Sequence, residues 1–95
     1  MAAPRLTESE IATALAALPQ WRYEAGALRR SYRFPDFVRA FSFMTACALI
    51  IQQMDHHPEW SNVYGSVEVT LVTHDSDGVT ARDVELARRI ESLAA

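Results

Sequence analysis

The sequence contains no lysine, a single cysteine and no long hydrophobic run, and each absence narrows the class of protein. All nine basic residues are arginine and the formal net charge is −3. They are dispersed apart from two small groups, Arg29, Arg30 and Arg33 and then Arg88 and Arg89. A protein that neutralises a phosphate backbone needs a clustered positive face. We therefore expect no nucleic-acid partner.

The single cysteine, Cys47, cannot form an internal disulfide, so no oxidising compartment is implied. It lies in the apolar run FMTACALII, where a small buried hydrophobe is more typical than a reactive nucleophile. The longest apolar stretch, residues 46–51, is far shorter than the ~20 residues of a membrane span. The opening segment MAAPRLTESE has no apolar signal core. These features predict a cytoplasmic protein with no membrane partner.

What is present indicates one small folded domain over residues 1–95. Hydrophobic residues make up 49% of the chain and charged residues 22%, which are globular proportions. A chain of this length buries roughly 60–65% of its unfolded surface. Further burial in a homodimer or homotetramer is therefore expected.

The order of helical and strand patterns predicts an α+β fold. In chain order, the expected elements are a helix from the Thr7–Glu10 capping box to Pro19, strands at residues 21–24 and 28–34, a helix at residues 35–55, strands at residues 63–64 and 67–73, and a helix capped by Thr80. Hairpins give antiparallel neighbours. We expect a four-stranded antiparallel sheet with three helices packed on one face, in the order α-β-β-α-β-β-α.

The long central helix is apolar on more than one side. Its apolar residues recur at three- and four-residue spacing, and others broaden that face: Phe37, Phe41, Met44, Ala48 and Ile51, then Phe43, Cys47 and Ile50. We expect burial on several sides of this helix, with Trp21, Phe41 and Phe43 in the core.

Three histidines are the candidate catalytic groups. His56 and His57 are adjacent at the end of the long helix, and His74 ends a strand beside Asp75. Histidine changes protonation near neutral pH, which suits general acid–base catalysis at the ends of elements, where clefts form. The alternative is that they are surface or capping histidines, which the helix dipole favours at a helix C-terminus.

Other interpretations of these residues stay open. A metal site would use the histidines with Asp55 or Asp75, but adjacent histidines rarely bind one ion and no HExxH or cysteine-pair spacing accompanies them. Trp60 and Tyr64 suit either stacking on a flat heterocycle or the core. Asp83 is either a helix-dipole acid or a group that reaches the histidines, and the sequence favours the first.

One set of motifs closely resembles the pterin-4a-carbinolamine dehydratase family. The similarity covers nearly the whole chain from Trp21 onward. The motifs that carry it are Asp55-His56-His57-Pro58-Glu59-Trp60, Asn62-Val63-Tyr64, Thr73-His74, Gly78-Val79-Thr80 with Asp83, Leu86-Ala87, and the stretch at residues 39–44.

The resemblance implies a fold, an assembly and a reaction. The fold has the same element order and assembles as a dimer or tetramer. The reaction is that of a lyase, which removes water from 4a-hydroxytetrahydropterin to give quinonoid dihydropterin. It recycles the pterin of aromatic amino-acid hydroxylases and needs neither a metal nor an organic cofactor.

The resemblance also assigns roles to residues. His56 and His74 are the acid–base candidates, and His57 positions the pterin. The same pocket would be lined by Asp55, Thr73 and Asp75, with Gln52, Trp60 and Asp83 as supporting residues.

Gln52 is a departure from the family pattern, which usually has an ionisable residue four positions before the first histidine. We expect Gln52 to share a helical face with His56 without stabilising its protonated form by charge. The departure raises the alternative of a non-catalytic interaction protein on the same fold. Family members of that type act as a dimerisation cofactor of a homeodomain transcription factor or as assembly factors of a carbon-fixing enzyme.

Overall fold

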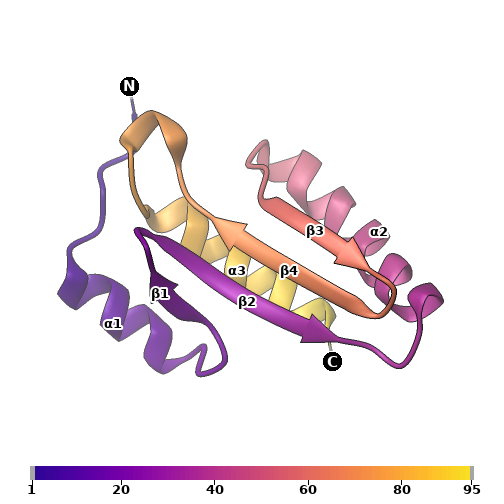
Figure 1. The fold of residues 1–95 in the computed structure, drawn as a ribbon. Helices are drawn as coiled ribbons and strands as arrows, with labels where there is room; N and C mark the ends of the chain where they lie inside the picture. Colours follow the sequence, from indigo (N-terminus) through magenta and orange to yellow (C-terminus); the bar gives the residue numbers. More distant parts are fainter. Residues whose placement is uncertain (1, 95) are drawn as a thin grey trace.

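The structure, a computed structural model that describes residues 2–94, has the predicted order of helices and strands (Figure 1). Its elements are α1 (Glu8–Ala16), β1 (Arg22–Glu24), β2 (Ala27–Arg33), α2 (Phe37–Met54), β3 (Glu59–Val63), β4 (Ser66–Leu71), the 3-10 turn η1 (His74–Ser76) and α3 (Ala81–Leu93).

The four strands form one antiparallel sheet in the order β1-β2-β4-β3. The register of β2 with β4 pairs Leu28 with Leu71 and Tyr32 with Val67, and these four side chains are buried on one face of the sheet. The intervening residues of the two strands, such as Ser31 and its partner Glu68, are exposed on the other face. Because successive side chains of a strand point to opposite faces, the sheet has one apolar face and one polar face.

Helices α2 and α3 cover the apolar face of the sheet, and α1 lies beside β1 at its edge (Figure 1). The predicted capping box at Thr7 and the predicted cap at Thr80 are both present. Thr7 accepts from the backbone N–H of Glu10, and Thr80 begins α3 with Asp83 at the third helical position. α1 ends at Ala16, three residues before Pro19, and α2 begins at Phe37 with Asp36 as its N-cap.

The expectation that α2 is buried on several sides is wrong for a single chain. Only one stripe of α2 is buried, and it consists of Ala40, Phe43, Cys47 and Ile51. Phe41, expected in the core, is 53% exposed. Burial raises the pKa of the Cys47 thiol to about 12, which fits the predicted role as an inert hydrophobe.

The exposed side of α2 is also apolar. Phe37, Val38, Phe41 and Leu49 are exposed, and Arg39 is the only charged residue of the helix. With 18 residues of mean hydropathy 1.3, α2 meets the length and composition of a membrane span. The core helix of a globular domain meets the same criterion, and the buried stripe of α2 packs in this core.

The third strand is longer than predicted. It begins at Glu59 rather than at residue 63, and all five of its residues pair with β4. The polar residues Glu59, Ser61 and Asn62 gave no apolar run from which this part of the strand could be predicted. The two-residue turn that follows requires glycine. A Cβ at Gly65 would clash with the carbonyl oxygen of Phe34, and the Phe34 N–H donates to the Gly65 carbonyl oxygen.

Candidate active site

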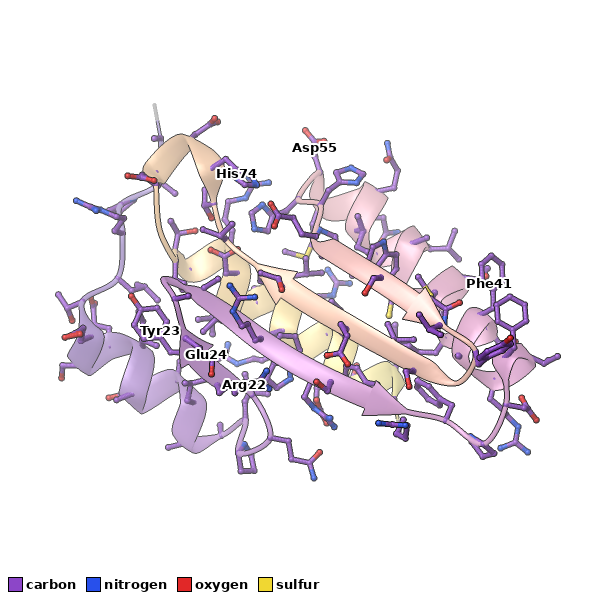
Figure 2. The ribbon with its side chains drawn as sticks, viewed as in Figure 1. Arg22, Tyr23, Glu24, Phe41, Asp55 and His74 are labelled. Carbon is purple, nitrogen blue, oxygen red and sulfur yellow. The ribbon has the colours of Figure 1, made fainter. Side chains whose placement is uncertain are left out.

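The end of α2 and the end of β4 meet at one end of the sheet. Figure 2 shows Asp55 and His74 there, whereas Phe41 lies toward the other end of α2. α2 ends at Met54, and Asp55 adopts the left-handed conformation with φ 50° and ψ 44°. Aspartate tolerates this conformation better than most non-glycine residues. The turn sends the following histidine pair away from the helix axis.

A hollow of about 230 Å³ opens at this junction. Three segments line it: the α2 terminus, the segment after β4 and the start of α3. Its lining residues are Asp55, His56, His57, Val72, Thr73, His74, Asp75 and Arg82. The structure thus gathers all three histidines with the three residues expected to line the same pocket.

His56 is the buried histidine of the three. Its side chain is 8% exposed, and its Nε2 lies 2.6 Å from Oδ1 of Asp83, which is fully buried. A carboxylate only accepts hydrogen bonds, so Nε2 carries the proton that is donated. In neutral His56 the lone pair is then on Nδ1, which is the nitrogen able to accept a proton.

Asp83 is held by donors on both of its oxygens. The hydroxyl of Thr73 and the backbone N–H of Thr80 each donate to Oδ2 at 2.8 Å. The hydroxyls of Thr73 and Thr80 are 2.7 Å apart. Asp83 therefore caps α3 and also contacts His56, so the two interpretations of this residue do not exclude each other.

His57 and His74 differ from His56 in exposure. Both are exposed, and Nε2 of His74 lies 3.3 Å from Oε1 of Glu59 at the start of β3. An ion pair at this exposure contributes little to stability. The hollow therefore combines one fixed, buried imidazole with two that solvent reaches.

Three residues singled out from the sequence lie away from the hollow. Gln52 is exposed, and it does not share a helical face with His56 because the helix ends at Met54. Trp60 packs partly buried against the hydrophobic core, and Tyr64 is 82% exposed in the turn after β3.

Arg82 and Glu59 were missed by sequence reasoning. Arg82 lines the hollow, and Glu59 reaches His74. The available signals were local: Arg82 precedes Asp83, and Glu59 lies within the His-His-Pro-Glu-Trp motif. Neither spacing indicates a contact between elements that are far apart in the chain.

A second polar cluster lies beside a larger hollow of about 480 Å³ near the end of α3. Oε1 of Glu91 accepts from Trp21 Nε1 at 2.8 Å, Tyr32 Oη at 2.6 Å and Arg30 Nε at 3.2 Å. Partial burial alone would raise the pKa of Glu91, but the hydrogen bonds and the charge of Arg30 outweigh it and lower this pKa. Burial, with the Glu91 contact, raises the pKa of Tyr32. Trp21, Tyr32 and Arg30 already donate to Glu91, so we assign this cluster a structural role.

The histidines of the hollow do not form a metal-binding cluster with the nearby carboxylates. Across residues 2–94, no three side chains of His, Cys, Asp or Glu gather closely enough to hold a metal ion.

Comparisons with known proteins show one family. The family model of pterin 4 alpha carbinolamine dehydratase matches residues 4–93. A protein of Rhizorhabdus wittichii named "Putative pterin-4-alpha-carbinolamine dehydratase" is 54% identical over 91 residues, covering 94% of each chain. One of the same name from Burkholderia multivorans is 55% identical over 93 residues, covering 96% of this chain and 91% of its own.

A solved structure is similar over the whole fold. It is described as a transcriptional coactivator/pterin dehydratase from Brucella melitensis and is 47% identical, with a TM-score of 0.93. The match covers 96% of this chain and 99% of that one. Fold, motifs and relatives agree, and the chain belongs to the pterin 4 alpha carbinolamine dehydratase family.

Proposed function

We propose that the chain dehydrates 4a-hydroxytetrahydropterin to quinonoid dihydropterin in the hollow at the end of α2. The observation that carries this proposal is the buried His56–Asp83 pair, 2.6 Å apart, at a hollow that two further histidines line. A base held in one tautomer beside a second titratable imidazole is what general acid–base catalysis requires.

The proposed reaction balances with two proton transfers. Nδ1 of His56 takes the proton from a ring nitrogen, and protonated His74 gives a proton to the 4a-hydroxyl. The C4a–O bond then breaks, water leaves and a C=N bond forms. Nothing is oxidised or reduced, so the reaction requires no redox cofactor. Proton exchange with solvent restores both imidazoles, and the exposure of His74 favours that exchange.

Substrate binding is assigned to the polar rim of the hollow. His57 positions the pterin, and Asp55, Thr73 and Asp75 offer acceptors and donors to its polar edge. The hollow is smaller than the ~300 Å³ at which ligand pockets usually begin. A bound pterin would therefore stay partly exposed. In the cell the reaction would recycle the pterin of aromatic amino-acid hydroxylases.

The proposal is tested by following dehydration of 4a-hydroxytetrahydropterin with and without the wild-type protein. We expect a rate that rises in proportion to protein concentration above the uncatalysed rate. A rate equal to that in buffer at micromolar protein would contradict the proposal.

Protein binding is the second candidate function, and the exposed apolar face of α2 favours it. This face includes Phe37, Val38, Phe41 and Leu49. We assign it to a second copy of the chain, because an uncharged apolar surface is complementary to itself and a small chain gains burial by pairing. The relative described as a coactivator/pterin dehydratase makes a different protein the alternative partner.

Phe41→Glu is expected to convert an oligomer to monomer, because it places a charge in the centre of this apolar face. Sedimentation velocity at micromolar concentration measures the change. Tyr23→Glu adds the same charge to another exposed aromatic at the opposite side of the molecule (Figure 2) and should leave the oligomer intact. A monomeric wild type, or an unchanged Phe41→Glu oligomer, would refute the assignment.

A further inference from the structure

The C-terminus of α2 is bound by a side chain from a different helix. The last four carbonyls of a helix have no partner within it. Nη2 of Arg82, in the first turn of α3, donates to the carbonyl oxygens of Met54 at 2.8 Å and Asp55 at 2.9 Å. These two residues are the last of the helix and its left-handed cap. The cation thus sits where the negative end of the helix dipole is strongest.

The bound segment is the one that directs the histidine pair. Asp55 is in the left-handed region, which costs an L-residue free energy and persists only when its surroundings hold it. His56 follows directly, and its backbone N–H returns to the Ile51 carbonyl oxygen at 3.3 Å. A shift in the φ and ψ of Asp55 would therefore move both imidazoles relative to the hollow.

We propose that Arg82 is a positioning residue, which holds the left-handed turn at Asp55 so that His56 and His57 face the substrate. The proposal rests on the dehydratase function proposed above. Two adjacent residues hold different parts of the same segment, since Arg82 binds the backbone before His56 and Asp83 binds the ring of His56. Both come from the rigid first turn of α3, so the start of one helix fixes the end of the other.

Because Arg82 is exposed, its effect on catalysis can be measured separately from its effect on folding stability. The residue is exposed and its two hydrogen bonds lie at the surface, so their loss affects global stability little. The catalytic rate is more sensitive than stability to the loss of this contact, because a displacement of about 1 Å in a reacting group can lower the rate by up to about 10²-fold. Loss of the contact should therefore appear in kcat before it appears in the unfolding temperature.

The test uses Arg82→Met, which keeps length and helix propensity but has no donor, and Arg82→Lys, which keeps the charge and donors. Arg88→Met, an exposed arginine of the same helix, is the matched control. We expect Arg82→Met to lower kcat about 10-fold, equivalent to about 1.4 kcal/mol, with KM changed less than about 3-fold. Arg82→Lys should recover part of kcat, and Arg88→Met should match the wild type.

Ring signals of 15N-labelled histidine provide a second readout that does not need turnover. They should shift for His56 and His57 in Arg82→Met and not in Arg88→Met. Wild-type kcat and unshifted rings in Arg82→Met would overturn the inference, as would a loss of activity explained fully by unfolded protein. An inactive wild type would refute the dehydratase function alone, and the ring signals would still decide whether Arg82 holds the histidines.

Discussion

Replacing Asp83 with asparagine is expected to lower kcat for dehydration by about 10²- to 10⁴-fold, the range over which general acid–base groups contribute. The carboxylate keeps the proton of His56 on Nε2. An asparagine that turns its amide nitrogen toward His56 reverses this hydrogen bond, since its oxygen is needed by Thr73 and Thr80. The proton then moves to Nδ1, which can no longer act as a base.

Stability has to be separated from catalysis in that variant. Asp83 is fully buried, so the change should also cost about 1–3 kcal/mol of stability, and rates should be measured well below its unfolding temperature. Glu85→Gln removes one negative charge from an exposed position of the same helix and is the control. An Asp83→Asn protein that is folded and turns over at the wild-type rate would rule out this role of the carboxylate.

Glu91→Ala is expected to lower the free energy of unfolding by about 2–4 kcal/mol, because it removes the acceptor of three donors. The cluster ties β2 and the residue before β1 to the last turn of α3. At about 4–8 °C per kcal/mol for a domain of this size, the unfolding midpoint should fall by roughly 8–32 °C. Glu85→Ala should change it by no more than a few degrees.

The same carboxylate predicts a dependence of stability on pH. Its folded pKa lies below the ordinary value of 4.5. The unfolded chain therefore binds the proton first as pH falls, and this contribution is complete above about pH 4.5 and lost below it. Glu91→Gln should flatten the acid limb of a plot of unfolding midpoint against pH. An unchanged acid limb in that variant would show that other groups cause the acid lability.

Local rules predicted the order of the elements and placed the three histidines at the ends of elements. Thr7 with Glu10 and Thr80 with Asp83 start helices through contacts three residues apart, which sequence spacing reveals. The positions of the three histidines at the ends of elements indicated a cleft there. These features depend on neighbours along the chain, so the sequence is sufficient for them.

Contacts between elements that are far apart in the chain could not be predicted from the sequence. α2 is apolar nearly all round, so periodicity could not distinguish the buried Phe43 from the exposed Phe41. The bonds from Arg82 to Met54 and from Asp83 to His56 join residues 27 or 28 positions apart. They exist because α2 and α3 pack side by side on the sheet, which no local pattern encodes.

The most direct measurement of the central claim is the initial rate of carbinolamine dehydration by the wild type and His56→Ala, with Ser61→Ala on the exposed face of β3 as the control. We predict catalysis by the wild type and the control, and a fall of at least about 100-fold in folded His56→Ala. A His56→Ala protein as active as the wild type would contradict the account.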